Sequence, residues 1–290
     1  MNNLVYQRPK NVAEATAHLL QYPDACALAG GQSLLASMKL GLLQPSHVID
    51  LQDIPELKDI RLTNEGLWIG AMLTHAQVAS NTLVRTFNPM LCQLAGGIAD
   101  PQVREVGTLG GSLANNDPAA CWTAGVMGLG ATLVTTQRRL VADAFFTGLF
   151  STALHTGELI TGVLFPKVLQ AHYLKFEQPA SRFALTGVAV ARMSTKQVRV
   201  AITGLGHGVT RWFDAEQALQ QRWHVDALQD LRLDPSHALS DLHASADYRA
   251  HLAGVLCRRA VAAMGDTVLA SSSSSLMQQL RQLIHSFVRR

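Results

Sequence analysis

Cysteine, charge and long apolar runs are all scarce in this chain of 290 residues. The four cysteines stand far apart with no C-x-x-C pair, so their spacing cannot hold an iron–sulfur cluster or a structural zinc ion. No stretch approaches the roughly 18 uninterrupted apolar residues that a membrane span needs. The N-terminus lacks the apolar segment behind a basic start that marks a signal peptide. These absences predict a soluble protein of a reducing cytoplasm, without a metal site of its own.

What the chain contains in abundance is apolar residues. Hydrophobic residues make up 48% of it and charged residues 16%, which is typical of a globular protein with a large core. The length fits two domains. The formal charge of +3 is small and no run of lysine or arginine occurs, so a nucleic-acid partner is not expected.

The first half of the sequence alternates predicted helices and strands. Helices are expected where apolar residues recur at intervals of three and four, and strands at short apolar runs bounded by turn residues. A short apolar run at residues 26–29 ends in two glycines, after which Ser33 is positioned to cap a helix. The expected helices are residues 12–21, 34–43, 89–98 and 119–129, and the expected strands are residues 48–51, 67–69, 131–135 and 159–165.

The second half changes character. A polar, irregular stretch is expected at residues 167–181, with a domain boundary near 167–171. Strands followed by helices favour an α+β unit over a doubly wound sheet. The serine run at 271–275 is expected to be a linker. The expected strands of this half are residues 186–192 and 197–204, and the expected helices are residues 215–221, 246–264 and 275–288.

Two glycine elements are the most informative segments: the first glycine element is residues 29–33 (AGGQS) and the second is residues 108–112 (TLGGS). Adjacent glycines permit the positive φ angles and close approach with which backbone N–H groups converge on a phosphate. Ser33, Thr108 and Ser112 add hydroxyl donors, and a helix that begins after Ser33 directs its positive end toward an anion. These residues alone leave two readings open, a pair of tight turns or a clamp for a phosphate-bearing ligand.

A third glycine cluster, at residues 204–208, resembles a dinucleotide fingerprint. The third glycine of G-x-G-x-x-G would fall at Val209, and no clean amphipathic helix follows. We interpret this cluster as a turn.

Several blocks of the sequence resemble one known family. They are AGGQSLL at residues 29–35, IGA at 69–71 with Thr74 and His75, and PQVR at 101–104 running into GTLGGS at 107–112. Gly204, Arg211 and Glu216 continue the match into the second half. These blocks are similar to those of the flavin subunits of molybdenum hydroxylases, the medium subunits of carbon monoxide dehydrogenase and of bacterial aldehyde and N-heterocycle hydroxylases, which are related to the flavin domain of xanthine dehydrogenase.

The resemblance implies an α+β fold of the vanillyl-alcohol-oxidase (PCMH) type. An FAD-binding domain at residues 1–168, with subdomains near 1–54 and 55–168, would precede an α+β C-terminal domain at 172–290 with an antiparallel sheet and helices. One FAD would be held without a covalent link, its pyrophosphate between the glycine elements. The cofactor-binding residues that the resemblance implies are Leu28, Ala29, Gly30, Gly31, Gln32, Ser33, Leu34, Ile98, Thr108, Leu109, Gly110, Gly111, Ser112, Asp117, Cys121, Ile160, Lys175 and Phe183.

Some of these residues have roles implied by position. Leu28 and Leu34 would flank the first glycine element, and Ile98 and Ile160 would give apolar contacts to the cofactor. Lys175 matches a lysine near the flavin in the family.

Two positions depart from the family pattern. Cys121 stands where the family usually has an acid that can bond the adenosine ribose, and a thiol is a poor acceptor. If the ribose lies there, Cys121→Asp would strengthen FAD binding; if Cys121 instead packs into a helical core, a buried acid would destabilise the fold. Phe183 stands where carbon monoxide dehydrogenase often has a tyrosine against the flavin ring, so stacking is kept and the hydroxyl is lost.

The resemblance also implies partners, and no catalytic acid or base on this chain. A large subunit with a molybdenum-pterin cofactor would oxidise the substrate, and electrons would pass through two [2Fe–2S] clusters of a small iron–sulfur subunit to FAD and on to an external acceptor. The expected assembly is a dimer of heterotrimers. Two other interpretations stay open, a free-standing flavin oxidoreductase with its own substrate site and a non-enzymatic nucleotide-binding assembly protein.

Overall fold

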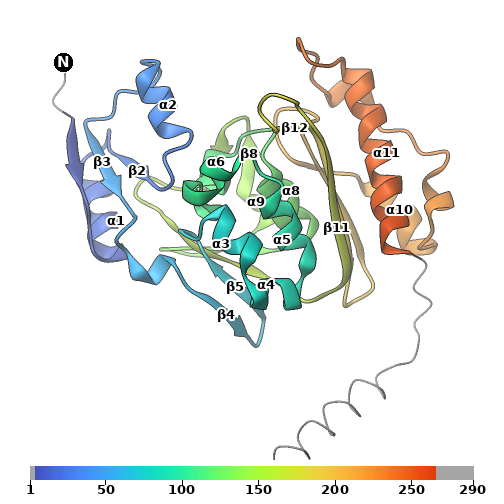
Figure 1. Ribbon diagram of the computed structural model, residues 1–290, viewed down its shortest axis with the longest axis horizontal. Coiled ribbons are helices and arrows are strands. Elements are labelled where there is room, and N and C mark those ends of the chain that lie inside the picture. The colour runs from blue at the N-terminus through green and yellow to red at the C-terminus, as the bar shows by residue number, and fades with distance from the viewer. Residues whose placement is uncertain (1–3, 266–290) are drawn as a thin grey trace, which may run out of the picture.

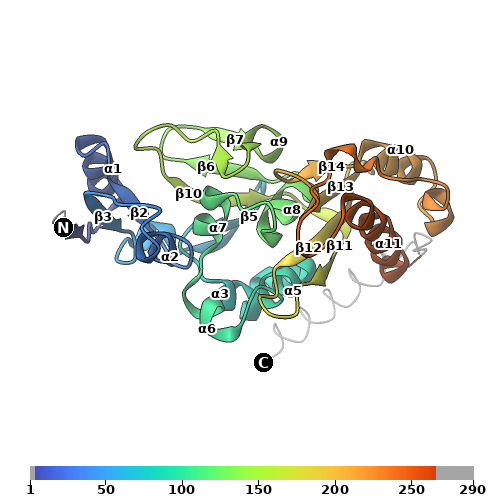
Figure 2. The ribbon, with the colours of Figure 1, turned by 90° about the horizontal axis from the view of Figure 1, so that it is seen from above.

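Three units follow one another along the long axis of the protein, each built on its own sheet (Figures 1 and 2). The computed structural model describes residues 4–265. A parallel three-stranded sheet lies at one end, an antiparallel five-stranded sheet in the middle, and an antiparallel four-stranded sheet at the other end. No helix within residues 4–265 is long and apolar enough to cross a membrane.

The N-terminal unit has the strand order β1-β3-β2. Parallel neighbours need crossover connections, and two helices supply them here. Ala15 and Leu19 on one face of the first helix are buried in a core with Ile49 and Ile54. The first glycine element is the turn from β2 into the second helix. The elements of this unit are β1 (Val5–Gln7), α1 (Val12–Gln21), β2 (Cys26–Leu28), α2 (Leu34–Lys39), β3 (His47–Asp50) and a 3₁₀ turn (Pro55–Leu57).

The central unit has the strand order β4-β5-β10-β6-β7, with a run of short helices between β5 and β6. These helices are short because polar caps restart the chain repeatedly: Thr74, Asn81, Asn88, Asp100 and Thr108 each accept a backbone N–H of the first turn. Its strands are β4 (Ile60–Thr63), β5 (Gly66–Gly70), β6 (Thr132–Thr135), β7 (Arg139–Val141), β8 (Phe146–Gly148), β9 (Ser151–Thr152) and β10 (Ile160–Phe165). Its helices are α3 (His75–Ser80), α4 (Thr82–Phe87), α5 (Pro89–Gly96), α6 (Pro101–Val106), α7 (Leu109–Asn115), α8 (Cys121–Gly128) and α9 (Ala142–Phe145).

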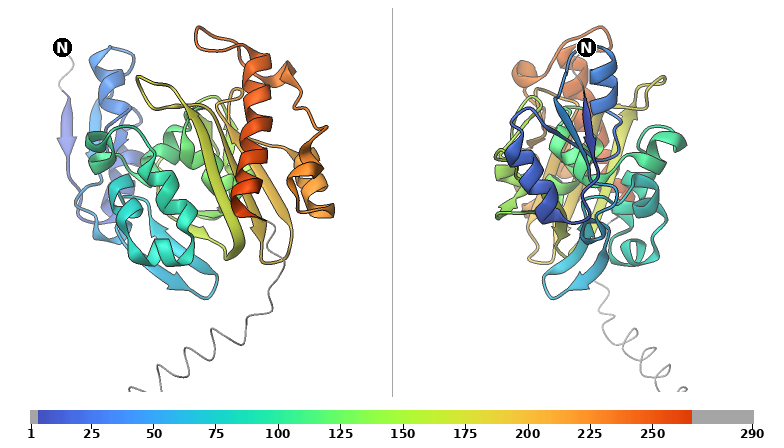
Figure 3. Two further views of the ribbon diagram at one scale, coloured as in Figure 1. Left: turned by 45° about the vertical axis from the view of Figure 1, so that its right-hand side comes forward. Right: turned by 90° about the vertical axis from the view of Figure 1, so that its left-hand side faces the viewer.

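The C-terminal unit has the strand order β11-β12-β13-β14, and its long last helix packs along that sheet (Figure 3). Val188, Val200 and Ile202 of the sheet share a core with Ala253 and Leu256 of this helix. The elements are β11 (Val168–Glu177), β12 (Ala184–Met193), β13 (Val198–Thr203), β14 (Thr210–Arg211), α10 (Phe213–Gln221), α11 (Ala246–Met264) and 3₁₀ turns at Val225–Leu228 and Pro235–His237.

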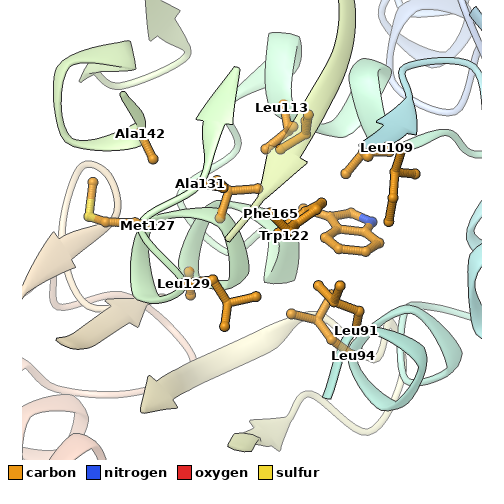
Figure 4. Packing of buried hydrophobic residues seen from close by; sticks show 14 of the residues in the cluster. Leu91, Leu94, Leu109, Leu113, Trp122, Met127, Leu129, Ala131, Ala142 and Phe165 are labelled. Carbon is orange, nitrogen blue, oxygen red and sulfur yellow. The ribbon is translucent and has the colours of Figure 1, made fainter. Parts of the chain in front are cut away.

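Helix α8 joins the central unit to the C-terminal sheet. Every one of its residues is buried, as expected of a helix that is apolar on all sides. Trp122 lies among Leu91, Leu109 and Phe165 (Figure 4). On the opposite face, a Cβ on Gly128 would come within 2.8 Å of the Ala189 Cβ of β12, so only glycine lets the sheet approach this closely.

Most element predictions from the sequence are confirmed, and two are wrong. The helices expected at residues 12–21 and 246–264 have those bounds, and the turn expected at 204–208 is present. The irregular stretch expected at 167–181 is instead mostly the ten-residue strand β11, whose mixed polarity arises because both faces are only partly covered. The second glycine element does not have the positive φ angles that the glycine pair was expected to supply, because Gly110 and Gly111 lie in the first turn of α7. The linker and helix expected at 271–275 and 275–288 fall outside the described residues.

Candidate functional site

A cavity of about 710 Å³ lies where the three units meet. Its walls come from both glycine elements, from residues 98–103, from residues 158–160 and from the turn between β11 and β12. Of the residues expected from the sequence, Leu28, Leu109 and Lys175 do not line this cavity. Those that do are Ala29, Gly30, Gly31, Gln32, Ser33, Leu34, Ile98, Thr108, Gly110, Gly111, Ser112, Asp117, Cys121, Ile160 and Phe183.

The first glycine element leaves its backbone donors free. Gly31 has a φ of +69°, the left-handed conformation that the sequence predicts for this glycine pair. Within residues 4–265, no hydrogen bond uses the N–H of Gly30, Gly31, Gln32 or Ser33. All four residues line the cavity, and the Ser33 hydroxyl makes no cap hydrogen bond. Consecutive N–H groups of this kind form a concavity that binds anions.

The second glycine element differs, because all of its backbone donors except the Thr108 N–H are already used. The Leu109 N–H donates to the Leu73 carbonyl at 3.0 Å and the Gly110 N–H to the Ala71 carbonyl at 2.7 Å. The Gly111 N–H donates to Thr108 Oγ1 at 3.1 Å. The expectation that both elements present a set of free N–H groups to a phosphate is therefore wrong for Leu109, Gly110 and Gly111. What the second element offers the cavity is the Thr108 N–H and the Ser112 hydroxyl, for which no partner occurs among the described residues.

Glycine in the second element serves close packing. A Cβ on Gly110 would come within 2.6 Å of the Ala71 Cβ, so this glycine lets α7 press against the end of β5. A Cβ on Gly111 would lie 3.2 Å from the Ala29 Cβ of the first element. Conversely, a Cβ on Gly30 would overlap the Val106 carbonyl oxygen. Gly30 and Gly111 thus let the first element lie close against residues 106–111 along one wall of the cavity.

The turn between β11 and β12 brings the C-terminal unit into the cavity wall. Phe183 lies there with 48% of its surface exposed, so its ring is available to a planar ligand. Lys175 stands behind this turn, where its Nζ donates to the carbonyls of Gly97 and Arg182, each at 2.6 Å. Lys175 therefore ties the turn to the segment before Ile98 and does not face the cavity.

Cys121 lines the cavity and is also part of the hydrophobic core. Its side chain is only 5% exposed and lies in the cluster around α8. Burial raises the pKa of the Cys121 thiol, although the nearby charge of Lys175 and a contact with the Tyr173 hydroxyl oppose the shift. Asp117 is also largely enclosed: burial raises its pKa, and its carboxylate accepts the Ala119 N–H at 2.8 Å.

Two ionisable residues of the wall were not singled out as ligands from the sequence. Glu158 is buried, and hydrogen bonds from Arg138, Thr135 and the His155 backbone overcome the cost of burial and lower its pKa to about 2. It is an ionised structural anchor. His75 is buried at the start of α3, and burial, followed by the charge of Arg104, lowers its pKa to about 4.

The chemistry of the wall fits FAD. Free backbone N–H groups and the hydroxyls of Ser33 and Ser112 suit a pyrophosphate, and Ile98, Ile160 and Phe183 give an apolar surface for a flat ring. No group of three or more His, Cys, Asp or Glu side chains in residues 4–265 could hold a metal ion. The site is therefore suited to a nucleotide cofactor.

Comparison with known proteins gives consistent matches over both halves of the chain. The family described as "FAD binding domain in molybdopterin dehydrogenase" matches residues 2–168, and the family described as "CO dehydrogenase flavoprotein C-terminal domain" matches residues 171–264. The nicotine 6-hydroxylase medium subunit of Paenarthrobacter nicotinovorans is 33% identical over 273 residues, which cover 90% of this chain and 96% of that protein. The carbon monoxide dehydrogenase medium chain of Afipia carboxidovorans is 36% identical over 274 residues, covering 88% and 94%.

The solved structures agree with the sequence matches. Reconstituted carbon monoxide dehydrogenase from Oligotropha carboxidovorans superposes with a TM-score of 0.83 at 30% identity, over 90% of this chain and 97% of that chain. Quinoline 2-oxidoreductase from Pseudomonas putida superposes with a TM-score of 0.79 at 27% identity, over 90% and 96%.

Proposed function

This chain belongs to the family of FAD-binding medium subunits of molybdenum hydroxylases, and from that premise we propose that it holds one FAD, without a covalent link, as the electron-transfer site of a larger complex. The predicted α+β fold of the PCMH type is that of the family. Electrons would arrive from the [2Fe–2S] clusters of a small partner subunit and leave to an external acceptor. A molybdopterin-containing large subunit would complete a heterotrimer, present twice in the assembly.

The observation that carries this proposal is the set of four free N–H groups at the first glycine element. Backbone donors that have no protein acceptor must bind water or a ligand, and the residues that carry these four line the cavity. Here they are consecutive, Gly31 lies in the left-handed conformation, and the cavity beside them is lined with apolar residues as well. An anion linked to a larger flat group satisfies both parts of this wall.

The residues of this chain would bind, orient and enclose the cofactor, while the redox chemistry is that of FAD itself. The first glycine element would hold the pyrophosphate, and Ile98, Ile160 and Phe183 would exclude water from the ring. Asp117 and Cys121 would lie toward the adenosine ribose. The Cys121 thiol is buried and its pKa is raised, so it is a poor nucleophile and supports a non-covalent link.

Purification of the chain and titration with FAD test the binding proposal. We expect one FAD per chain, released into the supernatant when the protein is precipitated with acid. Flavin retained on the denatured chain would contradict the non-covalent link. A nucleotide without a redox-active flavin would favour a nucleotide-binding assembly protein.

Co-expression with the genes of the neighbouring subunits tests the complex. We expect molybdenum, iron and FAD to elute together, and the isolated chain to reduce dyes without oxidising the substrate of the complex. Full substrate turnover by a monomer of this chain would favour a free-standing flavin oxidoreductase.

A further inference from the structure

His75 occupies an unusual place in the cavity wall. It is the first residue of α3, next to the capping box that Thr74 and Gln77 form. Its backbone N–H donates to the Gly107 carbonyl at 2.9 Å, which ties α3 to the residue just before the second glycine element. The side chain is 5% exposed and lines the cavity. The imidazole therefore sits between the core and the cavity, beside the second glycine element.

The hydrogen bonding of the ring fixes its tautomer. Trp122 Nε1 donates to His75 Nδ1 at 3.1 Å, and an indole nitrogen is a donor only. Nδ1 must therefore carry a lone pair. Because burial and the charge of Arg104 lower the pKa of His75 to about 4, the ring is neutral near pH 7 and its proton lies on Nε2. Trp122 is fully buried among Leu91, Leu109 and Phe165, so the donor has a fixed position (Figure 4).

The Nε2–H group has no partner of its own among residues 4–265. It lies beside Gly107, where a Cβ would come within 2.9 Å of Nε2. Nε2 is not among the unpaired polar atoms that are fully enclosed, so it keeps some accessible surface. The remaining accessible surface of this buried ring therefore includes a single directed donor. Gly107 keeps the space in front of it open, because any side chain there would collide with the ring.

We propose that His75 donates its Nε2–H to an acceptor atom of the bound cofactor, and that Trp122 holds the imidazole in the tautomer that makes this possible. The inference rests on the proposed occupation of the cavity by FAD. A neutral donor differs from a lysine or arginine in one useful respect, since it binds an acceptor without adding a positive charge beside Arg104. The second glycine element, most of whose own N–H groups are used internally, would thus receive a further donor from α3.

Two substitutions separate a ligand-binding role from a purely structural one. In His75→Asn the amide oxygen takes the place of Nδ1 and can still accept from Trp122, but nothing replaces Nε2–H. In His75→Gln the amide nitrogen reaches toward the position of Nε2, but the Trp122 N–H loses its acceptor. A purely structural role predicts normal FAD affinity in His75→Asn and a loss of stability in His75→Gln only.

The experiment measures the FAD dissociation constant by flavin fluorescence and the thermal unfolding of the apoprotein for both variants. We expect His75→Asn to weaken FAD binding by about tenfold or more with near-normal apoprotein stability, because one hydrogen bond to the ligand is lost. We expect His75→Gln to retain more affinity than His75→Asn while unfolding at a lower temperature. His172→Asn is the matched control, since His172 is a half-buried histidine of β11 that does not line the cavity.

The tautomer is measured independently of FAD, in the apoprotein, from the long-range ¹⁵N–¹H spectrum of the histidine rings. We expect a neutral ring protonated at Nε2. A ring protonated at Nδ1, or equal FAD affinity of His75→Asn and the wild type, would overturn the inference. Failure of the wild type to bind FAD at all would instead contradict the proposed function, and the titration of the wild type shows that first.

Discussion

The two glycine elements are nearly alike in sequence and unlike in structure. Both contain a glycine pair followed by serine, at once or after one residue, and both lead into a helix. In the first, the N–H groups of four residues are free and Gly31 has a positive φ. In the second, Leu109, Gly110 and Gly111 donate inside the protein. The first element leaves donors free at the cavity, where we propose that they bind a ligand, and the second uses its glycines for close packing.

The comparison shows that glycine can be required for two separate physical reasons within one site. Gly31 is required mainly for its conformation, because an L-residue in the left-handed region is strained, whereas the atom that a Cβ would meet first is the end of the flexible Leu35 side chain. Gly110 is required for its lack of volume, because Ala71 occupies the space that a Cβ would need. Substitutions at the two positions should therefore fail in different ways.

The largest expected effect is that of Gly110→Val. Overpacking of a tight contact costs about 1–3 kcal/mol, and the collision here involves the backbone of Ala71 as well as its Cβ, so we expect the free energy of unfolding to fall by about 3 kcal/mol. FAD binding should be lost together with stability. Denaturant unfolding of the apoprotein measures this, with Gly208→Ala as the silent control, since a Cβ there meets nothing within 4 Å. Normal apoprotein stability in Gly110→Val would break the comparison.

Cys121→Asp tests whether Cys121, the first residue of α8, also serves packing as the glycines of α7 do. Because the thiol is 5% exposed, a carboxylate would be buried with only the Tyr173 hydroxyl beside it as a donor, and we expect a loss of about 2 kcal/mol or more in unfolding free energy. The core position thus favours destabilisation over the gain in affinity that a ribose contact would give. Thermal unfolding and the FAD dissociation constant distinguish the two. Tighter FAD binding at unchanged stability would place the ribose at this residue.

Gly31→Val tests the first element. Valine in the left-handed region costs about 1–2 kcal/mol, and we expect the turn to relax and displace the free N–H groups. FAD affinity should fall by about tenfold or more while the apoprotein loses less stability than Gly110→Val does. Gly31→Asn is the matched variant, because asparagine tolerates positive φ and should retain more affinity. If both variants bind FAD normally, the first element does not hold the pyrophosphate.

The smallest effects come from removing one hydroxyl from each element. Thr108 caps α7, so Thr108→Val should cost about 1 kcal/mol of stability. Ser33 makes no cap hydrogen bond, so Ser33→Ala should leave unfolding unchanged and weaken FAD binding a few-fold. Melting curves and FAD titrations on both variants check that Thr108→Val loses stability and that Ser33→Ala loses FAD affinity. A stability loss in Ser33→Ala with unaltered FAD affinity would reverse the assignment.

Much of the fold was accessible from the sequence because its signals are local. The helices at Val12–Gln21 and Ala246–Met264 have strong periodicity and begin at polar caps, Asn11 and Ser245. Strand β11 was missed because its hydrogen bonds to β12 are tertiary and its faces are only partly buried, which leaves no alternation to detect.

The sequence predicts which segments line the site, but not the physical role of each residue in it. Glycine pairs indicate tight backbone, but the sequence does not say whether the missing side chain makes room for a ligand or for a neighbour such as Ala71. Lys175, which the resemblance places near the cofactor, does not line the cavity and donates to the carbonyls of Gly97 and Arg182. The donor at His75 depends on a tryptophan 47 positions away, which no local pattern reveals.

Amide hydrogen exchange in the apoprotein and in the FAD complex distinguishes the two glycine elements, because it reports each backbone N–H separately. We predict that the N–H groups of Gly30, Gly31 and Gln32 exchange rapidly without FAD and become protected when it binds. Those of Leu109 and Gly110, already bonded to Leu73 and Ala71, should be slow in both states. Unchanged exchange at residues 30–32, with new protection at 109 and 110, would contradict the account.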